Sequence, residues 1–292
     1  MKLRPMLNTI RLASLIIALL GPAVIAAALM PFPSAALAGP WQALEPGLDL
    51  GKFQASKKSK LYDYPIAILK IDPAFYAFRL LSASEHDKRP RPVKAWCADF
   101  GLTAATNASM YLKNAPLKST GYMRNFSHLN NPRINGAFGA FMVFNPKVAD
   151  IPHVAMVDRR VQADWEKIIT KYDTVIQNYR LISNGKPVEG WAQQDKIYST
   201  AAVGTDEAGC VLFILSRAPY STYNFIRILT DLPLGLRHAM YVEGGPEATL
   251  YLNLKHRKKD WIGSFESGFF ENDDNIGEWS IPNVVGIERK SD

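Results

Sequence analysis

The sequence predicts an α+β domain in which a mixed, mostly antiparallel β-sheet is flanked by a few helices. Segments rich in β-branched and aromatic residues recur between short turn signals, and three segments are helix candidates, one by amphipathic spacing and two by their length and flanking Gly or Pro residues. The helical segments do not alternate strictly with the strands, as they would in a doubly wound fold. The chain shows neither a repeat nor a linker that would divide it, so we expect one domain over residues 64–290.

The N-terminus has the order of a secretory signal peptide. Basic residues precede an apolar run over residues 12–30, and small residues at 36–38 form a site for signal peptidase. We therefore expect a signal peptide over residues 1–38, cleavage after Ala38, and a periplasmic or secreted protein without a stable membrane span. The alternative is an uncleaved anchor, because the run approaches the ~20 residues that cross a bilayer. Residues 39–63 are expected to form an N-terminal extension.

The expected strands follow one another through the domain. The first two are separated by Asp72-Pro73-Ala74, which is typical of a hairpin turn, and Asn184-Gly185 marks another tight turn. Two late strands, over 239–243 and 248–252, are expected on either side of a glycine turn. The complete set covers residues 64–71, 75–81, 102–107, 137–144, 174–182, 198–203, 210–216, 239–243, 248–252 and 282–288.

Three helices and one long loop complete the prediction. Residues 93–100 have the length of a short helix and are followed by Gly101, residues 161–172 are amphipathic, and residues 223–232 end before a proline. Residues 112–136 mix small, polar and basic residues with little periodicity, which predicts a long surface loop. Loops of this length in compact domains are usually functional.

The composition excludes several classes of protein. Hydrophobic residues make up 48% of the chain, which is enough for a substantial core. Without the three basic residues of the signal, 31 basic and 27 acidic residues leave a charge of only +4. The basic runs at 57–60 and 255–259 are interpreted as solvated loops rather than a polyanion site. Nucleic-acid binding is not expected, since aromatic and basic residues are not interleaved.

The cysteines and histidines do not have the spacing of a metal site. Cys97 and Cys210 are far apart in sequence, so a single disulfide and two unlinked thiols both remain open. The five histidines are scattered, and no zinc motif is present. We predict no cofactor and no structural metal; a divalent cation is left open, although no feature of the sequence supports one.

Three short segments place small and polar residues at the end of an expected strand. They cover residues 107–111, 199–204 and 241–247. In the third, alternation along the strand puts Tyr241 and Glu243 on one face. A carboxyl group that leaves a buried strand beside two glycines lies at a pocket edge, where desolvation would raise its pKa for acid–base chemistry. The alternative is an ordinary hairpin turn with a solvated glutamate.

In this order, the segments resemble motifs of the phosphodiester glycosidase domain family, to which the lysosomal uncovering enzyme and many bacterial exported proteins belong. The family's N-G-G-F-F or N-A-G-M-F motif corresponds to residues 107–111, and its R-T-A-I-G motif to residues 199–204. Its Q-x-x-x-x-L-I-x-x-G-K stretch corresponds to residues 177–186, and its L-D-G-G-G-S-S motif to residues 242–248. A closing strand similar to V-P-N-x-x-x-V lies at residues 281–287.

The chain departs from these motifs at several positions. The family's aspartate is Glu243 here, and its arginine aligns near Ser199. The family's glycine and serines become Pro246, Glu247 and Ala248. A glutamate keeps the carboxyl group but moves it outward by one methylene. Loss of the arginine removes a phosphate ligand, which Arg124, Arg180, Arg217 or Lys113 would have to replace.

The resemblance implies an exported hydrolase that cleaves a sugar from a phosphodiester-linked or related envelope glycoconjugate. Glycoside hydrolysis normally uses two carboxyl groups. Glu243 is the first candidate, and its partner is left open between Glu247, Asp206 and Asp99. The expected substrate-binding residues comprise sugar-orienting, ring-stacking and phosphate-binding side chains together with neighbouring small residues: Asn107, Ser109, Tyr111, Arg124, Thr200, Tyr241, Gly244 and Gly245. The alternative is a non-catalytic carbohydrate- or glycolipid-binding module with the same fold.

Overall fold

The computed structural model of the protein describes residues 40–291, so the expected signal peptide lies outside the described part of the chain. The described residues form nineteen strands, three α-helices and one short 3-10 helix. Every strand pair is antiparallel. The expected antiparallel pairing is confirmed, but the protein is mostly β rather than α+β.

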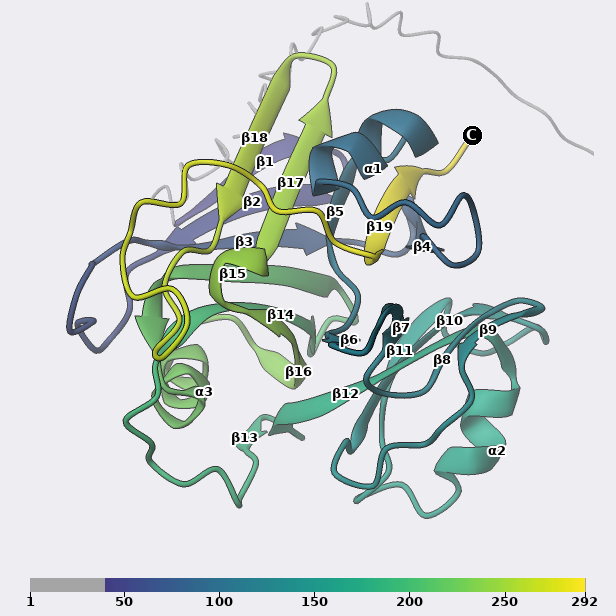
Figure 1. Ribbon diagram of the computed structural model, residues 1–292. Coiled ribbons are helices and arrows are strands. Elements are labelled where there is room, and N and C mark those ends of the chain that lie inside the picture. Colours follow the sequence, from purple (N-terminus) through teal and green to yellow (C-terminus); the bar gives the residue numbers. More distant parts are fainter. Residues whose placement is uncertain (1–39, 292) are drawn as a thin grey trace, which may run out of the picture. The chain divides into compact units, whose positions relative to one another are not determined.

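The larger of the two main sheets has twelve strands (Figure 1). Its main path runs in the order β1 (Trp41–Glu45), β2 (Leu48–Phe53), β3 (Ile66–Ile71), β15 (Val211–Tyr220), β14 (Tyr198–Asp206), β16 (Leu236–Gly244), β12 (Tyr172–Ser183), β10 (Ala140–Pro146) and β11 (Val154–Asp158). Beside β12 it also includes β13 (Lys186–Pro187), β8 (Met123–Asn125) and β9 (His128–Asn131).

The smaller main sheet has five strands. They follow the order β18 (Arg257–Ile262), β17 (Thr249–Leu254), β5 (Ala104–Asn107), β19 (Asn283–Arg289) and β4 (Tyr76–Ser82). A separate hairpin is formed by β6 (Tyr111–Leu112) and β7 (Ala115–Ser119). The two main sheets share one core, in which Leu69 and Phe213 of the larger sheet cluster with Phe78 and Ile287 of the smaller. The protein is therefore a β-sandwich.

Each helix covers an outer surface of the sandwich. α1 (Val93–Phe100) packs Trp96 and Cys97 against the smaller sheet and ends at Gly101, whose φ of 68° suits glycine. α3 (Thr222–Asp231) buries its apolar face against the larger sheet. α2 (Trp165–Thr170) covers β10 and β12, where Trp165 stacks on Phe141. These helices seal the sheet faces that do not meet in the sandwich core.

Two expected hairpins are wrong, and for the same reason. β3 and β4 flank the turn at Asp72–Ala74, yet β3 belongs to the larger sheet and β4 to the smaller. β16 and β17 are likewise divided between the sheets by the chain at Gly244–Ala248. The turn residues mark corners at which the chain crosses the sandwich. By contrast, the expected tight turn at Asn184–Gly185 is confirmed, with φ of 49° and 74°, and joins β12 to β13.

Three other segments differ from the prediction. Residues 112–136 contain β7, β8 and β9 rather than a continuous loop, and the N-terminal extension supplies β1 and β2 to the larger sheet. The helix expected over 161–172 is limited to α2, because Tyr172 already pairs with β10 as the start of β12. Short strands with mixed polar sequence carry too little periodicity to be recognised.

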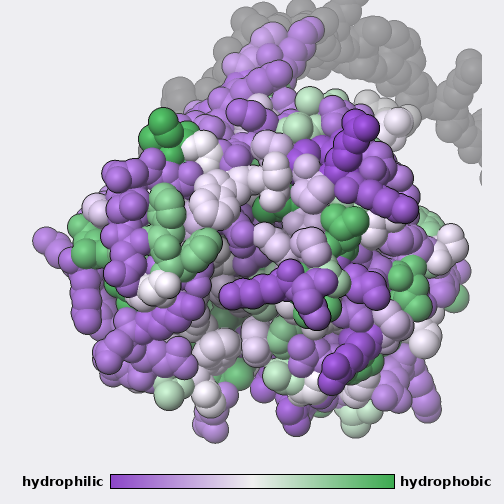
Figure 2. Space-filling view, viewed as in Figure 1, coloured by the Kyte–Doolittle hydropathy of each residue, from purple (hydrophilic) through white to green (hydrophobic). Residues whose placement is uncertain are grey.

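The described residues also show the character of the surface, the lengths of the helices and the state of the two cysteines. On the face seen in Figure 2, hydrophobic side chains form separate patches among hydrophilic ones. Within residues 40–291, no helix has the length and hydrophobicity to cross a membrane. Cys97 and Cys210 are both free thiols.

Candidate active site

A β-bulge aims two side chains of β16 at a cleft. The register between β14 and β16 shifts at the Ala201–Ala202 step of β14. Tyr241 and Glu243 line the cleft, while Met240 and Val242 belong to the sandwich core. This division confirms the alternation read from the sequence. Bulges commonly re-aim side chains beside active sites.

The cleft has a volume of about 650 Å³, within the range of roughly 300–1,000 Å³ that is usual for small-molecule sites. Its lining combines acidic, aromatic and basic side chains. The acidic residues are Glu243, Glu247 and Glu266; the aromatic residues are Tyr111, Tyr179, Trp191, Tyr198, Tyr241 and Phe269; and the basic residues are Lys113 and Lys196. Aromatic faces beside polar groups suit a ring that carries hydroxyls.

Glu243 is a buried residue of the cleft lining, with 6% of its surface exposed. Its Oε1 accepts a hydrogen bond of 3.0 Å from the backbone N–H of Gly244. Burial raises the pKa of Glu243 well above its ordinary value, and the neighbouring charge of Glu247 raises it further. The hydrogen bond from Gly244 opposes this shift but does not reverse it. Glu243 therefore keeps its proton to a higher pH than an ordinary glutamate.

Glu247 has a different environment in the same cleft. It lies in the 3-10 helix at Gly245–Glu247 and is only partly buried. Burial raises the pKa of Glu247 above its ordinary value, and the charge of Glu266 adds to this rise. A hydrogen bond donated by the Tyr111 hydroxyl and the charge of Lys113 offset only part of it. Two interacting carboxyl groups with unequal surroundings can divide the roles of acid and base.

A third carboxyl group, that of Glu266, reaches the cleft from the loop between β18 and β19. Glu266 Oε1 lies 2.7 Å from Lys196 Nζ. Gly245 allows this approach, because a Cβ at that position would lie 2.6 Å from Glu266 Oε2. Gly245 also has a φ of 67°, which favours glycine. The expected glycine pair thus provides space and backbone freedom for the acidic cluster.

Asn107 supports the site from behind the cleft. It is 1% exposed, its Nδ2 donates to the backbone oxygen of Glu247 at 3.0 Å, and its Oδ1 accepts from the Thr249 N–H at 2.8 Å. Both ends of the amide are therefore used by the segment that carries Glu247. Asn107 was expected to contact sugar hydroxyls, but the structure places it as a support for that segment.

Ser109 and Thr200 are also buried rather than directed into the cleft. Ser109 is 2% exposed, and its hydroxyl donates to Asn178 Oδ1 at 2.9 Å. Thr200 is 1% exposed, and its hydroxyl donates to the Tyr198 carbonyl at 3.4 Å. Neither lines the cleft in which both were expected to contact a substrate. Thr200 lies on β14 and Ser109 between β5 and β6, and at both buried positions a short hydroxyl side chain satisfies neighbouring polar groups.

The structure separates Asp206 and Asp99 from Glu243. Asp206 lies six positions from Thr200 along β14, which corresponds to about 20 Å of strand. It pairs with Lys70 at 2.8 Å and lines a different cleft. Asp99 is on α1 and pairs with Arg91. Of the three partners left open by the sequence, Glu247 is the one that shares the cleft of Glu243.

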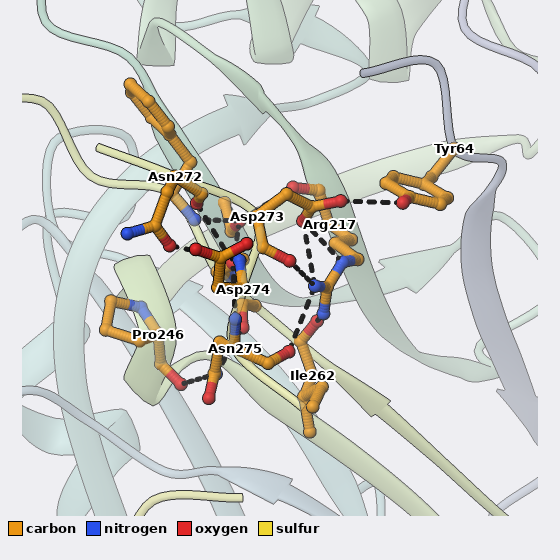
Figure 3. A network of polar contacts seen from close by, with 12 residues as sticks. Tyr64, Arg217, Pro246, Ile262, Asn272, Asp273, Asp274 and Asn275 are labelled. Atoms are coloured by element: carbon orange, nitrogen blue, oxygen red, sulfur yellow. Dashed lines mark hydrogen bonds and ion pairs between the residues drawn. The ribbon is translucent and has the colours of Figure 1, made fainter. Parts of the chain in front are cut away.

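The three candidate arginines are committed to structural contacts outside the cleft. Arg124 donates to the Tyr172 carbonyl, and Arg180 pairs with Asp158 at 2.9 Å. Arg217 pairs with Asp273 at 2.8 Å and donates to the backbone oxygens of Ile262, Asp273 and Asn275 (Figure 3). Arg124 was expected to bind phosphate, but the fold uses it for pairing between segments. Lys113 remains as the candidate cation that lines the cleft.

Sequence reasoning missed Glu266, Lys196 and Trp191. All three lie outside named strands and helices, in the segments 188–197 and 263–282. Hydrogen bonds between Ser267 and Ile197 join these segments. No local spacing signals such a meeting; a charged residue beside glycines at 263 and 268 is the only hint in the sequence.

Ser199, where the family motif has an arginine, connects β14 to the segment 263–282. It is fully buried, and its Oγ accepts from the backbone N–H groups of Ser264 and Phe265 at 2.9 and 3.2 Å. The hydroxyl donates to the Arg217 carbonyl. Among residues 40–291, no cluster of three or more His, Cys, Asp or Glu residues is arranged to hold a metal ion.

The chain belongs to the phosphodiester glycosidase family. The family model described as "NAGPA: Phosphodiester glycosidase" matches residues 100–288, and this range includes the cleft residues named above. No curated protein matches the chain by sequence.

Two solved structures show the same fold at low sequence identity. The auto-inhibited catalytic domain of zebrafish N-acetylglucosamine-1-phosphodiester alpha-N-acetylglucosaminidase has a TM-score of 0.61 and 14% identity, with 86% of this chain and 87% of that chain covered. A hypothetical protein from Synechocystis has a TM-score of 0.57 and 14% identity, with 86% of this chain and 64% of that chain covered. At these identities the similarity concerns the fold.

Proposed function

We propose that the protein is an exported hydrolase that cleaves a sugar from a phosphodiester-linked or related glycoconjugate of the cell envelope. Membership of the phosphodiester glycosidase family supports the reaction class. The observation that carries the proposal is the placement of Glu243 and Glu247 in one cleft with unequal environments. This arrangement suits a reaction that needs one proton donor and one proton acceptor.

In the proposed reaction, Glu243 is the acid and Glu247 the second carboxyl group. Protonated Glu243 gives its proton to the leaving oxygen as the bond between that oxygen and the anomeric carbon breaks. Water adds to the anomeric carbon, and its proton passes to Glu247, so that sugar and phosphate monoester are released. Burial raises the pKa of Glu243 well above its ordinary value, whereas Tyr111 and Lys113 partly offset the rise that burial causes in the pKa of Glu247, so Glu243 holds its proton more strongly.

The basic residues of the cleft lining would hold the phosphate. Lys113 is exposed, and Lys196 is half exposed with its ammonium group paired to Glu266. A lysine binds phosphate as a point charge rather than through the bidentate contacts of an arginine. We therefore expect Lys113→Ala to raise KM for a charged phosphodiester more than for a neutral glycoside. Lys118→Ala, an exposed lysine outside the cleft, is the matched control.

The aromatic lining favours carbohydrate as the bound group. Tyr241 and Tyr198 meet edge to face at 6.0 Å, and Tyr179 and Trp191 at 5.5 Å. Such surfaces would also serve a non-catalytic carbohydrate-binding module with the same fold. Turnover is therefore the measurement that separates the two functions.

The test uses the mature protein and a panel of sugar-1-phosphodiesters, with release of free sugar as the readout. We expect turnover by the wild type, loss of roughly 10²–10⁴-fold in kcat for Glu243→Gln, and no loss for Glu207→Gln, an exposed glutamate outside the cleft. Equal turnover by Glu243→Gln would remove that residue from the mechanism. Binding of the panel without turnover by the wild type would instead identify a binding module.

Export is tested separately. The motif in residues 1–38 supports it, and we expect N-terminal sequencing of the protein from its native envelope fraction to begin at Gly39. A cytoplasmic protein that retains Met1 would contradict this part of the proposal and leave the catalytic part standing.

A further inference from the structure

A second cavity opens between the two sheets of the sandwich. This groove has a volume of about 490 Å³, again in the range of small-molecule sites. Its walls come from β3 and β15 of the larger sheet and β18 of the smaller. It shares no lining residue with the active-site cleft.

The interior of the groove is the apolar core of the sandwich. Ala67 and Leu215 line it, are each 1% exposed, and belong to the main core cluster. Trp261 lines it from β18 and packs on the same cluster. At the rim, Ile276 is 94% exposed and Tyr64 is 40% exposed. Ala67 and Leu215 have almost no accessible surface left and close the floor, so an alkyl chain would cover the exposed parts of Trp261, Tyr64 and Ile276.

The mouth of the groove carries a small excess of positive charge. Lys52 and Lys259 are exposed lining residues, and Asp260 is the acidic one among them. The guanidinium of Arg217 is already neutralised by Asp273. The two lysines together outnumber the one free carboxylate, so the entrance favours an anionic group.

One wall of the groove is held in place by the network in Figure 3. Asp273 accepts hydrogen bonds from the Tyr64 hydroxyl at 2.6 Å and from Arg217 Nε at 2.8 Å. Asn275, which lines the groove, donates to the backbone oxygen of Gly263 at 2.7 Å. These contacts fix the loop after β18 and the segment before β3, which together form this wall of the groove.

We propose that this groove binds a single-chain anionic amphiphile, a fatty carboxylate, with its alkyl chain against Trp261 and Ile276 and its carboxylate near Lys52 and Lys259. The site is distinct from the proposed catalytic cleft, and the inference does not depend on hydrolase activity.

Strand geometry offers a matched pair of variants. The groove is lined by β18 from Lys259 onward, so that Lys259 lines it and the preceding Lys258 does not. Both are exposed lysines of one strand, and a charge reversal at either changes the net charge equally. The difference between them therefore isolates the groove from long-range electrostatics.

The test is calorimetric titration of the mature protein with decanoate below its micelle concentration. We expect one site, at least tenfold weaker binding for Lys259→Glu, unchanged binding for Lys258→Glu, and weaker binding of decylamine, which has the same chain length and the opposite charge. Acetate, which lacks the chain, should not bind. Absence of decanoate binding, an equal loss in both lysine variants, or equal binding of decylamine or acetate would each overturn the proposal.

Discussion

The side-chain amide of Asn107 donates a hydrogen bond to the backbone carbonyl of Glu247, at 3.0 Å. The oxygen of the same amide accepts from the Thr249 N–H at 2.8 Å. An expected substrate ligand therefore positions a candidate catalytic residue: it ties β5 to the corner at which the chain crosses from one sheet to the other.

Asn107→Ala should destabilise the protein and reduce activity together. Removal of the amide leaves two buried backbone groups without partners, each at a cost of about 1–3 kcal/mol. Urea denaturation measures this loss, with Asn114→Ala, an exposed asparagine of the β6–β7 hairpin, as the control. A variant with wild-type stability would show that the two bonds contribute little to folding.

Tyr111→Phe tests the environment of Glu247. The Tyr111 hydroxyl donates to Glu247 Oε1 and lowers the pKa of that carboxyl against the effect of burial. Without this bond the pKa of Glu247 rises further, so the carboxyl group keeps its proton to a higher pH. If ionised Glu247 is required, the acidic limb of the kcat/KM profile should move to higher pH. Tyr122→Phe, a tyrosine outside the cleft, should leave the profile unchanged.

The strands were predictable because a strand that is buried on both faces is recognisable from its local composition. β14 and β15 are almost completely buried, and both were found as runs of small or apolar residues. Their pairing was not predictable, because it is set by packing between distant segments. The turns at Asp72–Ala74 and Gly244–Ala248 have hairpin residues but separate the two sheets.

The candidate site likewise contains residues that the local sequence indicated and residues that it did not. Tyr111, Tyr241, Glu243, Gly244 and Glu247 lie at strand ends, where local sequence indicates a polar group beside small residues, and all five line the cleft. The loop residues that complete it have no such signal, because their position follows from long-range hydrogen bonds. Arg124 and the other two arginines were candidates for phosphate binding because of their charge, but they make structural contacts instead. Charge alone does not distinguish a ligand contact from a structural pair.

Arg217→Met should loosen the loop over residues 263–282. Arg217 donates to three backbone oxygens and to the Asp273 carboxylate, and most of its side chain is buried. Removal of one partner from a buried ion pair costs up to about 3–5 kcal/mol. We expect faster proteolysis within this loop and lower activity, since Glu266 is part of it. Arg227→Met, an exposed arginine on α3 that stacks on Tyr223, is the control, and equal proteolysis of both variants would contradict the assigned role.

The last prediction concerns the pH dependence of stability at Glu243. Its pKa is higher in the folded state than in the unfolded chain, because folding buries the carboxyl group. The stability linked to this proton is fully present below the unfolded pKa, about 4.3, and is lost as the pH rises through the folded pKa.

Glu243→Gln has no proton to lose and does not show this decline. The difference in Tm, variant minus wild type, should therefore grow from pH 4 toward pH 9, by about 2–4 °C for each 1 kcal/mol of relieved burial cost. Scanning calorimetry across this range measures it, and Glu207→Gln, at an exposed site, should give a flat difference. A flat difference for Glu243→Gln as well would mean that the carboxyl group is ionised in the folded protein at little cost. Glu243 could then not hold the proton that the proposed mechanism requires of it.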